Sequence, residues 1–156
     1  MKELPTNIQR YIAGDNLELL DGYIRFINIR DIKAFLDILS GKEFWESDIP
    51  FAITAFGDIF AWNSDGYIQF YKMTEGTSTI IMRGDKFFIQ NTADHEFQKA
   101  YFELDMFYAA KEQYGNLSPD QCYGFVPIPA LGGKKDVASI QIEPSLAYIA
   151  LLSEVF

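Results

Sequence analysis

The stretch YGNLSPDQCYGFVP (residues 114–127), followed by ALGG at 130–133, decides the fold more than any other part of this chain. It holds too many Gly, Pro and aromatic residues to form a helix, and it is too apolar to be a flexible linker. We therefore predict that residues 114–133 form an ordered loop held against a hydrophobic core.

The composition indicates one globular domain. A chain of 156 residues can bury a stable core, and its 49% hydrophobic and 16% aromatic residues exclude disorder. A single cysteine excludes an internal disulfide. The N-terminal residues contain no apolar segment typical of a signal peptide, and no apolar run is long enough to span a bilayer. We expect a soluble, cytoplasmic protein that has no membrane partner.

The formal net charge of −9 is spread along the chain without a basic block. Nucleic-acid binding is disfavoured, because phosphate contacts need clustered Lys and Arg. A basic protein partner would be attracted. Solubility alone also explains the charge.

Hydrophobic periodicity predicts helices and short strands in the first half of the chain. Asp21-Gly22 and Asn63-Ser64-Asp65-Gly66 are turn sequences between strands. The expected helices cover 4–12 and 29–40, and the expected strands cover 17–20, 23–28, 51–56, 59–62, 67–73, 77–82 and 86–90. The central strands are predicted to form an antiparallel meander.

After residue 91 we predict one long helix, capped by Thr92 or Asp94 and ending near Tyr114. A short strand is expected at 137–142 and a terminal helix at 145–156. The inward side of that last helix is predicted to carry Leu146, Ile149, Leu152 and Phe156.

Few residues suggest catalysis or metal binding. His95 is the only histidine, so a site with several imidazole ligands is impossible. Cys122 has no basic neighbour in sequence, which favours a buried structural thiol over a nucleophile. Asp58 and Asp65 each lie beside a glycine at an expected turn. Aspartate is common in turns, so their presence does not require a catalytic pair. We expect no catalytic residue, no metal and no cofactor.

The densest acidic segment is the loop with Glu43, Glu46 and Asp48, which also holds Phe44 and Trp45. Aromatic residues framed by carboxylates suit an interface with a basic partner. The simpler alternative, which we favour, is a solvated loop with Trp45 in the core. If the loop is an interface, Trp45→Ala should weaken partner neutralisation without unfolding the protein.

Two segments resemble known bacterial families. Residues 53–62 (ITAFGDIFAW) look like the central hairpin of GAD-like domains. FELDMF at 102–107, together with the segment at 114–133, resembles the C-terminal domain of type VI secretion immunity proteins that guard against DNase effectors. The layout is also similar to the SUKH superfamily of immunity proteins and glucan-synthesis regulators, in which a Leu-Pro-led helix precedes a Phe-Gly-Asp hairpin.

This resemblance implies a SUKH-like α+β fold, with a central, mainly antiparallel twisted sheet of about five to six strands and helices packed on it. It implies one immunity-type domain over 1–156, with a GAD-like part at 1–91 and a C-terminal immunity part at 92–156. The matched motif residues are expected to set backbone shape and to form the core. They are Phe56, Gly57, Asp58, Trp62, Cys122, Tyr123, Gly124, Pro127, Gly132 and Gly133.

The resemblance also implies a function without catalysis. The leading hypothesis is an immunity protein that binds a cognate toxin, a basic nuclease, and blocks it. The alternative is a regulatory adaptor or small-ligand-binding module of the same superfamily, which predicts a concave apolar pocket with convergent polar groups. An enzyme of unrecognised type is the third possibility, and it would need His95, Cys122 or paired acids in one cleft.

Overall fold

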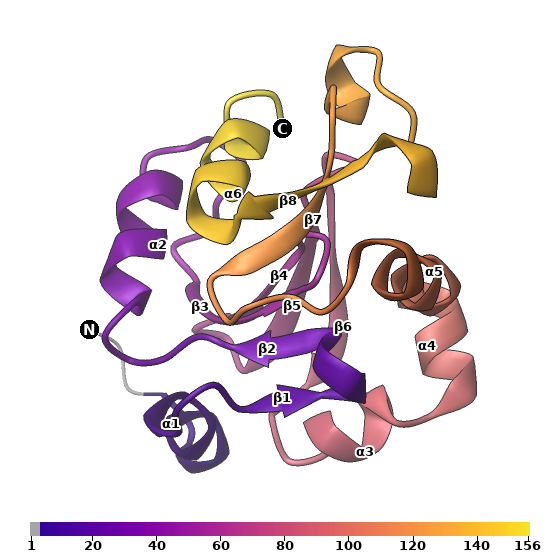
Figure 1. Ribbon diagram of the computed structural model, residues 1–156. Helices are drawn as coiled ribbons and strands as arrows, with labels where there is room; N and C mark the ends of the chain where they lie inside the picture. The colour runs from indigo at the N-terminus through magenta and orange to yellow at the C-terminus, as the bar shows by residue number, and fades with distance from the viewer. Residues whose placement is uncertain (1–3) are drawn as a thin grey trace.

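The computed structural model describes residues 4–156, in an α+β arrangement (Figure 1). The helices are α1 (Thr6–Ala13), α2 (Ile32–Leu39), α3 (Phe88–Thr92), α4 (His95–Tyr101), α5 (Leu104–Tyr114) and α6 (Ser145–Ser153). The strands are β1 (Glu18–Leu19), β2 (Ile24–Phe26), β3 (Ile49–Thr54), β4 (Ile59–Trp62), β5 (Tyr67–Lys72), β6 (Thr77–Arg83), β7 (Gln121–Phe125) and β8 (Ile140–Pro144). Short 3-10 turns cover Leu20–Gly22, Pro129–Leu131 and Val137–Ser139.

The main sheet is an antiparallel meander of six strands in the order β1-β2-β3-β4-β5-β6. Strands β7 and β8 form a separate antiparallel pair. The predicted fold class, with its antiparallel sheet and packed helices, is confirmed.

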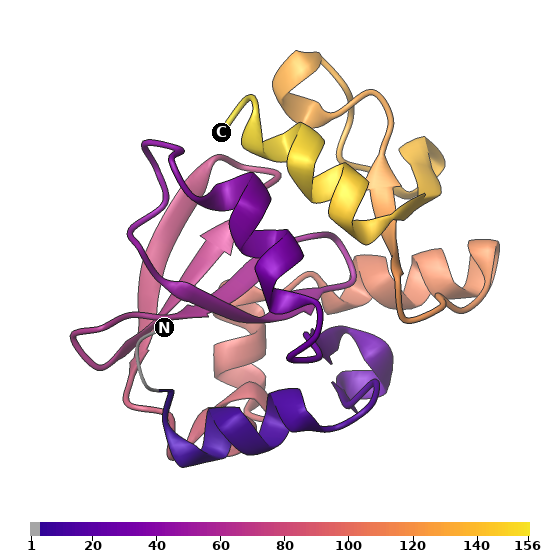
Figure 2. The same cartoon turned by 90° about the vertical axis from the view of Figure 1, so that its left-hand side faces the viewer.

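The sheet is covered on both faces. On one face Phe60 is paired across the strands with Phe70, and both rings lie about 6 Å from Phe102, which follows α4. Phe88 of α3 packs edge-on against Phe60 on the same face. The opposite face is covered by α2, α6 and the β7–β8 pair, with α2 and α6 side by side (Figure 2). The core therefore consists of two layers, one on each side of the meander.

The two edges of the main sheet differ. Strand β1 is only two residues long, whereas β6 has seven. The first part of β6, from Thr77 to Ile80, is exposed to solvent. These four residues carry no charge.

The prediction of a strand at 86–90 is wrong, because helix α3 begins within this segment, at Phe88. Its apolar residues do not alternate between two faces of a sheet. Phe88 alone is buried, while Phe87 and Ile89 are about half exposed. The ring of Phe88 lies near those of Phe26, Phe51 and Phe60, and this packing decides the local conformation.

The single long helix predicted up to Tyr114 is two helices, α4 and α5, separated at Phe102 and Glu103. Phe102 has extended backbone angles that turn its ring into the core. The Glu103 N–H donates a hydrogen bond to the Tyr23 hydroxyl at 3.0 Å. The side chain of Asp94 caps α4, as predicted, by accepting from the Phe97 N–H.

The predicted loop at 114–133 contains strand β7, so the prediction of an irregular segment is wrong for residues 121–125. Its partner β8 begins at Ile140, after a 3-10 turn over residues that we expected to start the strand. The Tyr123 N–H also donates to the carbonyl oxygen of Ala55, which ties β7 to the main sheet. In α6, Ile149 and Leu152 are buried as predicted, but Leu146 is exposed.

Candidate partner-binding surface

The acidic loop at 43–48 is pinned to the core by its aromatic residues. Trp45 is 8% exposed and stacks on Tyr71 of β5, with 4.5 Å between ring centroids. Phe44 stacks on Phe156, with 3.9 Å between centroids. Burial of Trp45 agrees with the simpler interpretation of this loop.

Asp48 also points inward. It is 2% exposed, and its carboxylate accepts hydrogen bonds from the Tyr71 hydroxyl at 2.8 Å and from the Asn63 amide at 3.2 Å. Burial, followed by the hydrogen bond to Asp48, raises the pKa of Tyr71 strongly, so this hydroxyl remains a donor.

The outer side of the loop is acidic. Glu43 and Glu46 are exposed, and Glu154, just after α6, is exposed near Glu43. Lys42 bridges the two segments with an ion pair to Glu154 at 2.8 Å. A depression of about 480 Å³ is lined by Lys42 and Glu43 on one side and by Glu154 and Phe156 on the other. We call Glu43, Glu46 and Glu154 the acidic surface; sequence reasoning missed Glu154, because only the packing of Phe44 on Phe156 brings it here.

The two family-like motifs pack directly against each other. Phe56 stacks on Phe125 with 5.5 Å between ring centroids. Gly57 has φ +87°, and its backbone lies against Tyr148 of α6. The segments at 53–62 and 121–127 thus form one packed unit.

Several motif residues have no room for another side chain. A Cβ at Gly124 would lie 2.7 Å from Tyr148 Cε1, and a Cβ at Gly133 would lie 1.7 Å from the Pro127 carbonyl oxygen. Gly132 adopts φ +94° in open space. Cys122 and Tyr123 are buried, Trp62 is partly buried, and the Val126–Pro127 peptide bond is cis.

Asp58 is buried next to a cluster of ion pairs. It is 1% exposed, and burial raises its pKa to about 6 although the charges of Lys72 and Lys135 act in the opposite direction. Lys135 lies 2.8 Å from Glu103 and 3.2 Å from Glu75. Burial alone would raise the pKa of Glu103, but Lys135 and Lys72 lower it overall. This cluster joins the β5–β6 hairpin to the α4–α5 break and to the segment after Gly133.

The residues considered for catalysis are not assembled in one cleft. Cys122 is fully buried, and burial raises the pKa of its thiol to about 12, whereas His95 lies on the exposed first turn of α4. Asp58 is buried while Asp65 is exposed in its turn. Among residues 4–156, no group of His, Cys, Asp and Glu is arranged to hold a metal ion. No helix within the same range has the length and apolar character needed to cross a membrane.

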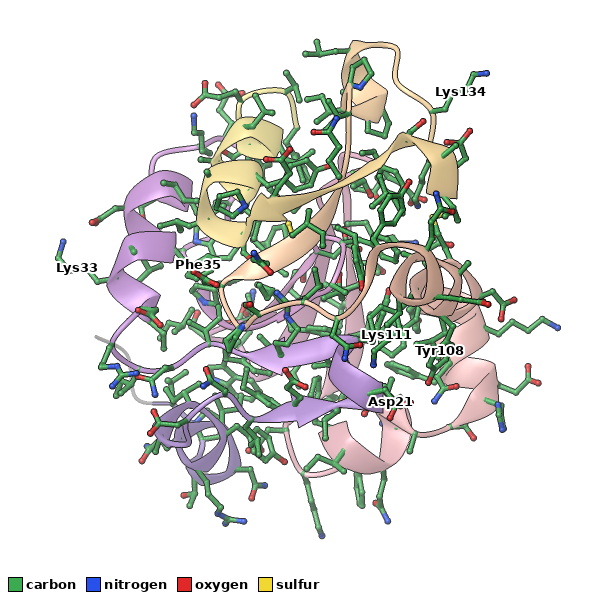
Figure 3. All side chains as sticks on the ribbon, in the orientation of Figure 1. Asp21, Lys33, Phe35, Tyr108, Lys111 and Lys134 are labelled. Atoms are coloured by element: carbon green, nitrogen blue, oxygen red, sulfur yellow. The ribbon has the colours of Figure 1, made fainter. Side chains whose placement is uncertain are left out.

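A second hollow lies between α2, β2 and the start of α6. It has a volume of about 420 Å³, and the buried Arg25 of β2 lines it. Figure 3 shows Phe35, another lining residue, on the inner side of α2, while Lys33 extends away from the protein.

The family comparison agrees with the resemblance found in the C-terminal part of the sequence. Residues 83–155 match the family described as T6SS immunity protein Tdi1, C-terminal. The fold is similar to a crystal structure of Atu4351 from Agrobacterium tumefaciens, with a TM-score of 0.75 and 18% sequence identity. That similarity covers 98% of this chain and 76% of the other, and at this identity it shows the fold alone. A search of curated proteins gave no match.

Proposed function

We propose that this chain, whose residues 83–155 match the C-terminal part of a type VI secretion immunity protein, is itself a toxin-neutralising immunity protein. It binds a cognate effector and blocks it, and it does so without catalysis. The family match carries this proposal. The separated positions of His95 and Cys122 support the non-catalytic part.

We also propose that the partner is a basic nuclease. The chain carries a net charge of −9 and an isoelectric point near 4.5. Carboxylates on its surface can occupy the positions that nucleic-acid phosphates take on a nuclease, and opposite net charges speed association at low salt.

The acidic surface is the proposed contact. Glu43 and Glu46 face the solvent, so they are free to meet basic side chains of the effector. Trp45 and Asp48 contribute indirectly, because their contacts with Tyr71 hold the loop in one conformation. A rigid loop loses little entropy when a partner binds it. The domain division into a GAD-like part at 1–91 and an immunity part at 92–156 stays a prediction.

Co-expression with the protein encoded immediately upstream tests the function. We expect that neighbour to stop growth alone, and this chain to restore growth and to co-purify with it. Absence of both toxicity and complex formation would overturn the proposed function.

Charge reversal tests the surface. Glu43→Lys with Glu46→Lys should slow association at low salt by about tenfold or more, and the difference should shrink at high salt. Glu96→Lys with Glu112→Lys makes the same change of charge on exposed residues of α4 and α5 and is the control. If both double variants slow association equally, the acidic surface is not the contact. The proposed immunity function would not be affected by that result.

A further inference from the structure

The most informative feature outside the acidic surface is the hollow of about 420 Å³ beside Arg25. Its wall is mixed, and the apolar part includes Phe26, Phe35 and Ile53 from β2, α2 and β3. Leu146 and the prolines at 119 and 144 complete it on the side of β7 and α6. A concave, partly apolar site of this size accommodates a small organic molecule.

Arg25 is a buried cation that makes no close ion pair in the described part of the chain, although Glu18 lies opposite it on β1. Burial lowers the pKa of Arg25, and the charges of Glu18 and Asp120 act in the opposite direction. The Arg25 side chain is 5% exposed, and among residues 4–156 no acid lies within ion-pair distance of it. Its Nη2 donates to the Gln121 carbonyl oxygen and, at 3.3 Å, to Ser145 Oγ. Its Nε is buried without a hydrogen-bond partner. Buried polar groups are normally hydrogen-bonded, so the unused Nε–H of Arg25 is a donor that an anion can satisfy.

A second, independent feature of the same hollow favours an anion. Helix α6 begins at Ser145 and is nine residues long. Pro144, Ser145 and Leu146 line the hollow. The Ser145 N–H donates to the Asp120 carbonyl oxygen at 2.8 Å, and no side chain caps this helix end in the described part of the chain. The N–H groups and the positive end of the helix dipole attract negative charge.

The remaining charges restrict the type of ligand. Arg30, Asp31 and Asp120 also line the hollow, and Arg30 lies 3.5 Å from Asp15. The two acids oppose a bare inorganic anion. Because these acids repel any anion, a ligand with one negative group also needs an apolar body, whose burial on the wall adds affinity.

We propose that this hollow binds a small carboxylate with an apolar body, whose carboxylate faces Arg25 and the start of α6. Such a group is provided by a free carboxylic acid or by the C-terminal residue of a polypeptide. This activity is separate from toxin neutralisation and is tested on the isolated protein.

The test compares N-acetyl-leucine with its neutral amide, N-acetyl-leucinamide, by NMR titration of the isolated chain. We expect the acid to bind at least about tenfold more tightly than the amide, because a charged hydrogen bond to the guanidinium is lost in the amide. The largest shifts should fall on Arg25, Ala34 and Leu146. Equal affinity of acid and amide, or no binding at about 10 mM, would overturn the proposal.

Two variants check the location. Arg25→Gln should reduce binding of the acid to the level of the amide, although loss of a buried residue could unfold the chain. Ala34→Trp avoids this problem, because Ala34 is only partly buried on α2 and lines the hollow. It should block binding and keep the fold, whereas Ala109→Trp on the exposed side of α5 should change nothing. Binding that survives Ala34→Trp would show that the ligand sits elsewhere.

A peptide ending in leucine distinguishes the two sources of carboxylate. Binding at least about tenfold tighter than N-acetyl-leucine indicates a polypeptide C-terminus, because the residues before it add contacts. Equal or weaker binding indicates a free acid.

Discussion

The indole ring of Trp45 stacks on the phenol ring of Tyr71, with 29° between the ring planes, and Tyr71 in turn donates a hydrogen bond to Asp48. A loop that looks like a flexible acidic segment in the sequence is therefore anchored at two points. Its carboxylates divide into one that holds the loop and two that face outward.

Trp45→Ala should destabilise the protein by about 3 kcal/mol or more, because it removes a large, nearly buried ring. The sequence-based expectation that this variant would not unfold applied only if the loop is an interface. Urea denaturation followed by circular dichroism measures the change. Trp62→Ala, at a partly buried ring, should cost less, and a larger loss there would contradict this account.

Two neighbouring glycines should respond very differently to substitution. Gly133→Ala should cost about 3 kcal/mol, because the new Cβ would overlap the Pro127 carbonyl oxygen. Gly132→Ala should cost only about 1 kcal/mol, since the site is open and only its positive φ is unfavourable. Denaturation of both variants under one condition compares them directly, and similar losses would be inconsistent with the close approach at Gly133.

Asp58 should make a pH-dependent contribution to stability. Burial raises its pKa to about 6, so its contribution is fully present below the pKa of the unfolded chain and is lost as the pH rises through about 6. At pH 7.5, Asp58→Asn should therefore be more stable than the natural protein by up to about 3 kcal/mol, and this advantage should shrink towards pH 5. Urea denaturation across this range checks the result; an advantage that is constant with pH would contradict it.

Lys135→Met should lower stability by about 1 kcal/mol or less, because its ion pairs with Glu103 and Glu75 are partly exposed. It should also raise the pKa of Glu103, which NMR titration can follow. Lys134→Met is the matched control, since Figure 3 shows Lys134 extending away from the protein. An equal loss for both lysines, or a loss that added salt does not reduce, would rule out the ion pairs as the cause.

The meander was predictable because its signals are local. Strands β4, β5 and β6 hold runs of aromatic and β-branched residues, and Asn63 to Gly66 form the turn between two of them. Each strand pairs with the next one in sequence, so no distant partner had to be guessed.

The errors occur where tertiary contacts decide. Residues 86–90 have the composition of a strand, but the pocket around Phe88 selects a helix. The break at Phe102 depends on the hydroxyl of Tyr23, 80 residues away from Glu103. Strand β7 forms only by pairing with β8. Because two 3-10 turns separate the two strands in sequence, no hairpin signal predicted this pairing.

The candidate surface was only partly visible in the sequence. The loop at 43–48 was found from its acidic residues, but the inward direction of Asp48 depends on Tyr71 and Asn63. The sequence did not predict that Arg25 is buried, because the residues that cover it and bond to it, Gln121 and Ser145, lie far away in the chain.

Arg25 has its hydrogen-bond partners 96 and 120 residues later in the chain, at Gln121 and Ser145. The meander that carries Arg25 pairs only strands that are neighbours in sequence, whereas the cover of Arg25 comes from β7 and α6, about a hundred residues later. Removal of residues 121–156 would therefore leave the strand pairing of the meander intact and expose a guanidinium that the complete fold buries.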